Sequence, residues 1–254
     1  MNRNVLMTVE YDGSAFHGWQ VQPGVRTVQD VLGQALSRVC GGEIKLNGAS
    51  RTDEGVHALG QAVSFAGDFG IPTERIPRAV NNLIEDARVL AATDVPEGFH
   101  ARFDARGKAY LYRIAASPEP DIFLRNYRYL LNESPDKSKM EEAAKRLVGT
   151  YDFSAFRTKG GAGENDTVRT ITAIGISQRN AEDTKGGTVR ETEVRVVGVG
   201  FMYNMVRIIV GTLVEVGLGS REPGSVTAAL ESRDRANAGH TAPAGGLYLE
   251  RVYY

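Results

Sequence analysis

The side chains best able to do chemistry in this 254-residue chain are concentrated between Arg51 and His57. This segment holds a guanidinium, a hydroxyl, two carboxylates and an imidazole around a glycine, and the strand-like residues 61–65 follow it closely. Ionisable groups this dense beside apolar sequence are typical of a loop held over a functional site. Polar turns built on Asp-Glu-Gly are far more common. The interpretation of Asp53 as a reactive carboxylate therefore needs support from other parts of the chain.

An arginine in an otherwise apolar helix pattern is the first such support. Arg207 lies within residues 203–216, which are apolar on nearly every side of a helix, and such a helix is buried. A buried guanidinium requires an anion, unless its long stem lets the head group reach water. We expect Arg207 to pair with a carboxylate, and Asp53 is the best candidate because it too is presented beside apolar strands.

The second support for a functional site is a strand pattern with aromatic residues on one face. Lys108, Tyr110 and Tyr112 share one face of this strand, and Ala109 and Leu111 share the other. A cation followed by two aromatic rings on one face can hold and stack an extruded base. Tyrosines in strands also commonly pack in the core with the hydroxyl at its rim, so this pattern alone favours neither interpretation.

The composition argues against a strongly basic protein, a disulfide-linked protein, a metal-binding protein and a membrane protein. The net charge is −1, from 30 basic and 31 acidic residues, so any surface for nucleic acid must be a local basic one. The single cysteine, Cys40, cannot form an intrachain disulfide, and the four histidines are scattered, so we expect no metal site. The N-terminus enters a strand pattern without an apolar leader, and no stretch approaches 18 apolar residues. These features predict a cytoplasmic protein with no membrane association.

Two successive series of predicted strands and helices, which we call the first and second round, must position the candidate residues. In the first round, Thr27 opens a helix with Asp30 as its capping-box partner, and Gly41-Gly42 ends it. The other elements expected in this round are strands at residues 5–10, 61–66 and 88–92 and a helix at residues 77–83.

The second round contains the remaining candidate residues. We expect strands at residues 110–115, 168–177, 188–197 and 247–253, helices at residues 134–148, 203–216 and 225–231, and a polar hairpin loop at residues 178–187. This order predicts an α+β fold of two ferredoxin-like or RRM-like halves, with mixed, mainly antiparallel sheets flanking a central cleft. The predicted halves are residues 1–104, with the Asp53 loop, and residues 105–254, with the Tyr110 strand and the Arg207 helix.

A series of motifs follows in order along nearly the whole chain: Glu10-Tyr11-Asp12-Gly13, Gly18-Trp19-Gln20, Arg51-Thr52-Asp53, Gly55-Val56-His57-Ala58, Phe99-His100-Ala101-Arg102-Phe103, Tyr110 with Tyr112, Asp152-Phe153-Ser154-Ala155-Phe156, Asn204-Met205-Val206-Arg207-Ile208-Ile209-Val210-Gly211, Thr241-Ala242-Pro243 and Gly246-Leu247-Tyr248-Leu249. Taken together, these motifs resemble those of the TruA family of tRNA pseudouridine synthases. Two residues beside Asp53 depart from the family pattern, since Ser50 and Glu54 stand where members commonly have Gly and Ala. Glu54 thereby adds a second acid next to the reactive one.

The resemblance implies an isomerase, an intramolecular transferase of the EC 5.4.99.12 type. It would convert uridine to pseudouridine at positions 38, 39 and 40 of the tRNA anticodon stem-loop, as a homodimer and without a cofactor. Asp53 would be the nucleophile and Arg207 its partner. Tyr110 would stack on the target uracil, and Arg51 would contact RNA or assist base flipping.

The chemistry agrees with these implied roles. Moving the glycosidic bond from N1 to C5 requires the base to be detached, turned and reattached in one closed site. A carboxylate can attack either C6 of the base or C1′ of the ribose, and an arginine keeps such a carboxylate ionised despite burial.

Two alternatives belong to different classes of protein. An RNA-binding module without catalysis would keep its RNA affinity after loss of Asp53 and would never form a modified product. A hydrolase using Asp53 with His57 and a metal would be sensitive to chelators, but the sequence lacks the ligand cluster of such a site.

Overall fold

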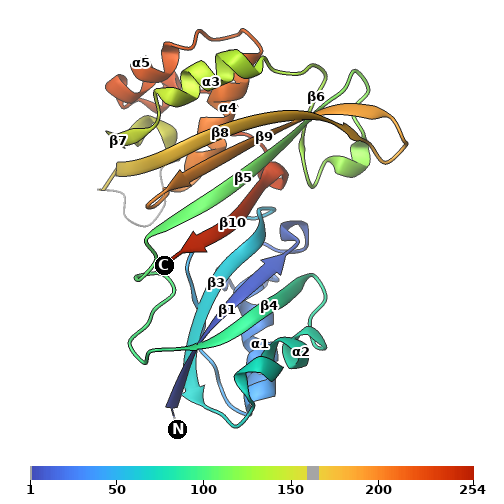
Figure 1. Cartoon of the computed structure of the whole chain (residues 1–254), viewed down its shortest axis with the longest axis vertical. Coiled ribbons are helices and arrows are strands. Elements are labelled where there is room, and N and C mark those ends of the chain that lie inside the picture. The colour runs from blue at the N-terminus through green and yellow to red at the C-terminus, as the bar shows by residue number, and fades with distance from the viewer. Residues whose placement is uncertain (1, 159–165) are drawn as a thin grey trace. The chain divides into compact units, whose positions relative to one another are not determined.

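The chain forms two compact units in the computed structural model, which describes residues 2–158 and 166–254 (Figure 1). Unit 1 consists of Met1–Arg106 together with Tyr248–Tyr254, and unit 2 consists of Gly107–Leu247. The sequence pattern placed the boundary after Asp104 and assigned the last strand to the second half. Periodicity identifies a strand but not the strand it pairs with, so the return of the last residues to unit 1 is not visible in the sequence.

Unit 1 is built on an antiparallel core of three strands. Its sheet has the order β4-β1-β3-β10, with β1 antiparallel to both β3 and β4 and with Tyr248 of β10 opposite His57 of β3 in parallel pairing. The strand β1 separates β3 from β4, and the short β2 also pairs with β3, as in a ferredoxin-like order. The elements are β1 (Asn2–Tyr11), α1 (Val28–Cys40), β2 (Asn47–Gly48), β3 (His57–Asp68), α2 (Ile76–Asn81), β4 (Ala87–Val95) and β10 (Leu247–Tyr253).

Helix α1 begins and ends where the sequence predicted, but its N-terminal cap is different. The capping-box prediction is wrong, because the Thr27 side chain makes no cap hydrogen bond and Asp30 instead accepts from Gln34 Nε2 at 3.0 Å. The first helical N–H groups, of Val28 and Gln29, donate to backbone carbonyls of the loop Gly18-Trp19 at 3.1 and 3.0 Å. This loop therefore satisfies the open helix end in place of a side chain.

In its described residues, unit 2 combines a mainly antiparallel sheet with three α-helices. Its strands follow the order β5-β9-β8-β7, and β6 pairs in parallel with β5. Helix α3 contacts both α4 and β8. The predicted α+β fold is thus confirmed. The elements are β5 (Gly107–Ala116), β6 (Tyr129–Leu131), α3 (Lys137–Lys145), β7 (Gly149–Asp152), β8 (Val168–Glu182), β9 (Thr188–Gly198), α4 (Met205–Gly217) and α5 (Ser225–Ser232).

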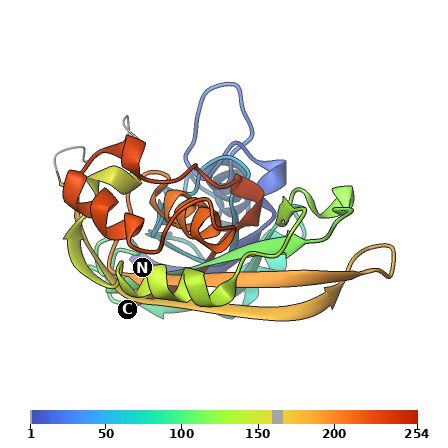
Figure 2. The same ribbon diagram turned by 90° about the horizontal axis from the view of Figure 1, so that it is seen from above.

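Two expected boundaries in unit 2 are wrong. Residues 178–187 do not all form a loop, because β8 continues to Glu182 and pairs with Thr188 of β9, and the resulting hairpin extends beyond the helices of its unit (Figure 2). An exposed two-stranded ribbon tolerates polar side chains, since cross-strand bonds satisfy its backbone. Helix α3 starts at Lys137, where Asp136 caps it by accepting from Ser138 N and Lys139 N.

Nothing in the described ranges 2–158 and 166–254 is a helix that combines the length and the apolar character needed to cross a lipid bilayer.

Candidate active site

The Asp53 loop of unit 1 is short and held from several sides. The neighbouring Thr52 is buried, its hydroxyl lies 2.8 Å from the Tyr11 hydroxyl, and its carbonyl accepts from Trp19 N at 3.0 Å. The Asp53 carbonyl accepts from Val56 N at 3.1 Å and closes a turn. These bonds fix the backbone on both sides of a half-buried carboxylate.

Glycines let a second loop pack against the Asp53 loop. A Cβ atom on Gly13 would lie 2.2 Å from the Val56 carbonyl oxygen, and one on Gly18 would lie 2.7 Å from the Thr52 carbonyl oxygen. Both distances are far below van der Waals contact, and Gly18 also has a φ of +82°. The two backbones can therefore touch only because these positions lack side chains.

His57 supports this packing instead of standing free in the site. Its Nδ1 accepts from Gly13 N at 3.0 Å, and its buried ring stacks on Tyr248 with centroids 4.7 Å apart. Asp12 Oδ1 also approaches the same nitrogen, at 3.3 Å. The bond to Nδ1 thus helps to hold the Gly13 loop against the Asp53 loop.

The residues flanking Asp53 differ in exposure. Arg51 is exposed. Ser50 is held by Gln61, whose side chain accepts from Ser50 N at 3.2 Å and donates to its carbonyl at 2.7 Å. Glu54 is exposed and lies 3.8 Å from His17 Nε2. The second acid beside Asp53 is therefore solvated in unit 1.

The two strand tyrosines of unit 2 have different environments. Tyr110 lies on β5 opposite Val196, with its ring edge against Phe201 at a centroid distance of 5.1 Å. Tyr112 is fully buried and donates its hydroxyl to the Pro243 carbonyl at 2.7 Å, and burial raises the pKa of Tyr112 well above its ordinary value. Both tyrosines are buried, Tyr110 with 6% and Tyr112 with 0% of its surface exposed, and the stacking of Tyr110 on a base stays a prediction.

Arg207 lies in the first turn of α4, and its guanidinium is oriented by two neutral oxygens. Its Nε donates to the Ala242 carbonyl at 2.7 Å and its Nη1 to Asn204 Oδ1 at 2.8 Å. Asn204 has a left-handed φ of 59°, and its amide donates to Thr158 Oγ1 at 3.1 Å. A non-glycine residue in this conformation is uncommon and marks a constrained position.

The four predicted site residues divide between the units. Asp53 and Arg51 belong to unit 1, and Tyr110 and Arg207 belong to unit 2. The pairing of Arg207 with Asp53 stays a prediction. Sequence reasoning did not identify Asn204 as a residue that orients the guanidinium, although it precedes Arg207 by three positions in a motif already noted.

Metal-binding side chains do not gather in the described part of the chain, where no three or more His, Cys, Asp or Glu residues form a group able to hold an ion.

Comparison with known proteins places the chain in a family. Residues 7–104 and 143–254 match the family described as tRNA pseudouridine synthase. The chain is 44% identical over 253 residues to tRNA pseudouridine synthase A of Acetivibrio thermocellus, covering 99% of this chain and 100% of that one. It is 43% identical over 250 residues to tRNA pseudouridine synthase A of Bacillus subtilis, covering 97% of each chain.

The chain therefore belongs to the tRNA pseudouridine synthase family. The resemblance found in the motifs is confirmed, and so is the predicted class of enzyme, an isomerase that forms pseudouridine in tRNA.

Proposed function

We propose that this chain converts uridine to pseudouridine at positions 38, 39 and 40 of the tRNA anticodon stem-loop, with Asp53 as the nucleophile. The observation that carries the proposal is the match to tRNA pseudouridine synthases A over nearly the full length of both chains. The braced loop that presents Asp53 supports it, because a nucleophile must be held in place while the base turns.

Each site residue has a role in this proposal. Asp53 attacks C6 of the uracil or C1′ of the ribose, the bond from N1 to C1′ breaks, and the base is reattached through C5, which then loses its proton. Arg207 pairs with Asp53 and keeps it ionised. Tyr110 stacks on the uracil flipped out of the stem-loop, and Arg51 contacts the RNA during flipping.

We further propose that the protein acts on tRNA in the cytoplasm as a homodimer and needs no cofactor. Membership of the family supports tRNA as the substrate. The homodimer and the independence from cofactors follow from the resemblance, and light scattering of the purified protein and assays in the presence of a chelator test them. The cytoplasmic location follows from the sequence features described above, and cell fractionation tests it.

Tritium release from tRNA labelled at uridine C5 tests the reaction and the nucleophile together. The wild type should release tritium with and without chelator, and Asp53→Ala should lower the rate at least about a thousandfold while still binding tRNA. An Asp53→Ala protein that keeps forming pseudouridine would remove Asp53 from its role. Binding by the wild type without any release would instead indicate an RNA-binding module, and chelator-sensitive strand cleavage would indicate a hydrolase.

A further inference from the structure

The backbone of Ala242 holds Arg207 at two points. Ala242 N donates to the Arg207 carbonyl at 3.1 Å, and the Ala242 carbonyl accepts from Arg207 Nε at 2.7 Å. The direction of the guanidinium therefore depends on where the peptide groups of Ala242 lie. What fixes the segment 238–242 also fixes Arg207.

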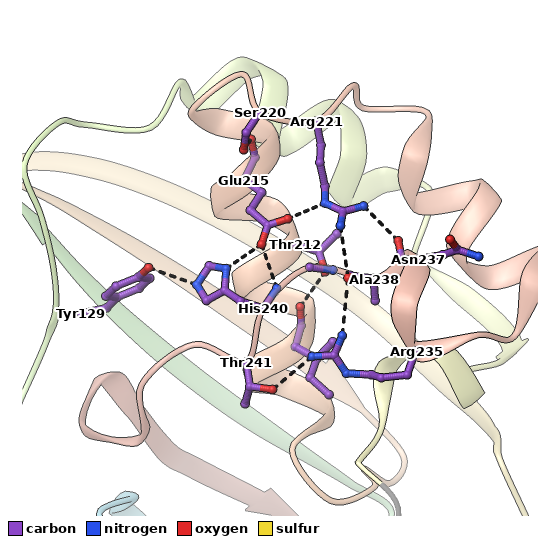
Figure 3. Close-up of polar contacts among 12 residues, drawn as sticks. Tyr129, Thr212, Glu215, Ser220, Arg221, Arg235, Asn237, Ala238, His240 and Thr241 are labelled. Carbon is purple, nitrogen blue, oxygen red and sulfur yellow. Dashed lines mark hydrogen bonds and ion pairs between the residues drawn. The ribbon is translucent and has the colours of Figure 1, made fainter.

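Glu215 is the charged anchor of this segment (Figure 3). Its Oε1 accepts from His240 N at 2.8 Å and lies 2.7 Å from His240 Nδ1, and its Oε2 pairs with Arg221 Nε. Arg221 in turn donates to the carbonyls of Asn237 and Ala238, at 3.0 and 3.2 Å. One carboxylate thus gathers a ring nitrogen, a backbone N–H and a guanidinium around the start of the segment.

Helix α4 carries both Arg207 and Glu215, the first and last residues in this set of contacts. Glu215 follows Arg207 by eight positions, so the two side chains lie near the same face of the helix. Between them the segment touches the helix backbone, since a Cβ atom on Gly211 would lie 2.0 Å from the His240 carbonyl oxygen and Gly239 N donates to Thr212 Oγ1 at 2.9 Å. A shift at His240 is therefore transmitted over a short, tightly packed backbone to Ala242.

His240 also connects the helix to the sheet. Its Nε2 lies 3.0 Å from the Tyr129 hydroxyl, and Tyr129 on β6 is paired with Ile114 of β5, the strand that carries Tyr110 (Figure 3). The imidazole thus bridges the helix of Arg207 and the strand of Tyr110 within unit 2.

We propose that Glu215 and His240 are positioning residues for the reaction, which hold the Ala242 carbonyl where it directs the Arg207 guanidinium. This inference rests on the proposed role of Arg207. Burial raises the pKa of Glu215, but donors from His240 and Arg221 outweigh it and hold that pKa below its ordinary value of 4.5. Glu215 is therefore ionised at neutral pH, and hydrogen bonds to a charged acceptor are about twice as strong as neutral ones.

A matched pair of substitutions at His240 tests the proposal. The amide nitrogen of His240→Asn can stand near Nδ1 and donate to Glu215, whereas the longer His240→Gln side chain reaches toward Nε2 and Tyr129. We expect His240→Gln to lower the single-turnover rate at least about tenfold, because small misplacements of catalytic groups are costly, while His240→Asn stays within about threefold of the wild type. The Kd for tRNA should change less than about twofold in both variants.

A second readout does not depend on catalysis. The Arg207 Nε–H proton, assigned in nitrogen-15 spectra by its loss in Arg207→Lys, is bonded to the Ala242 carbonyl and should exchange slowly with water. We expect faster exchange in His240→Gln and in Glu215→Asp, which withdraws the carboxylate by one methylene, but not in His240→Asn. Thermal unfolding of each variant checks that it is folded.

The single-turnover rate and the exchange of the Arg207 Nε–H proton together distinguish failure of the positioning role from failure of the proposed function. If the wild type never forms pseudouridine but exchange is faster in His240→Gln and Glu215→Asp, the proposed function is overturned and the positioning of Arg207 stands. Unchanged exchange in both His240→Gln and Glu215→Asp would overturn the positioning role, whatever happens to the rate. Equal loss of rate in His240→Asn and His240→Gln would also overturn it, because the donor to Glu215 would then not matter.

Discussion

At the scale of single residues, the candidate site depends on glycines as well as on reactive side chains, because positions without a Cβ allow two backbones to lie in contact. Asp53 is the reactive group, but Gly13 and Gly18 decide whether its loop can lie where it does, because each allows a backbone approach that a Cβ would block. The same holds in unit 2, where Gly211 lets the segment 238–242 pass close enough for Ala242 to bond Arg207.

Gly13→Ala should disturb both stability and catalysis. The new Cβ would meet the backbone carbonyl of Val56 at 2.2 Å, and backbone cannot rotate away as a flexible side chain can. We expect a loss of about 1–3 kcal/mol in the free energy of unfolding and a fall of at least about tenfold in the single-turnover rate. Chemical denaturation and tritium release measure the two effects.

Gly33→Ala is the matched control. Gly33 lies within α1, and a Cβ there would meet no atom within 4 Å. Alanine in a helix interior should stabilise the protein by about 0.5–1 kcal/mol and leave the rate unchanged. Equal effects at Gly13 and Gly33 would show that close packing against Val56 does not matter.

At the scale of elements, the long hairpin of β8 and β9 is secured by a buried charge. Glu191 is fully buried on β9, with Arg128 Nε at 2.9 Å from its Oε1 and Arg179 Nη2 at 2.5 Å from its Oε2. The second contact is an ion pair whose angles do not make a hydrogen bond. Arg179 lies on β8 and Arg128 directly precedes β6, so one carboxylate links three strands.

Glu191→Gln should therefore destabilise unit 2. Removing the charge of the buried carboxylate leaves two guanidinium groups without their anion. Arg179 is 62% and Arg128 21% exposed, so water compensates part of the loss, and we expect a cost of about 1–3 kcal/mol. Glu182→Gln, at the exposed end of β8, should stay within about 0.5 kcal/mol of the wild type. Denaturant titration measures both, and a Glu191→Gln protein as stable as the control would show that the buried charge contributes nothing to the hairpin.

At the scale of the whole molecule, tRNA binding must rest on local contacts. The net charge of −1 provides no overall attraction for a polyanion, so each phosphate contact should appear in the salt dependence of the affinity. The exposed Arg51 beside Asp53 is the first cation to test.

Arg51→Ala should weaken tRNA binding and reduce the slope of log Kd against log salt concentration by about 1, as expected for one lost phosphate contact. Binding measured across a series of salt concentrations checks this. An unchanged slope combined with a lower single-turnover rate would assign Arg51 to base flipping and not to phosphate binding.

The sequence by itself determined the family, the α+β class and the identity of the candidate residues. Local patterns suffice for these features: the Asp53 loop, the apolar helix around Arg207 and the strand of Tyr110 are each contained in a short run of residues. The approximate positions of the longer helices and strands followed for the same reason, since periodicity and glycine ends are local properties, whereas the short strands β2, β6 and β7 were not predicted.

Only the tertiary structure decided which groups support them. Four of these contacts are the capping of α1 by Gly18-Trp19, the bond from Gly13 to His57, the bond from Tyr112 to Pro243 and the anchoring by Glu215 of the segment next to Arg207. All of them depend on residues distant in sequence. The return of the last strand to unit 1 has the same origin. Such contacts are selected by packing and by the need to satisfy buried polar groups, and neither leaves a local pattern in the chain.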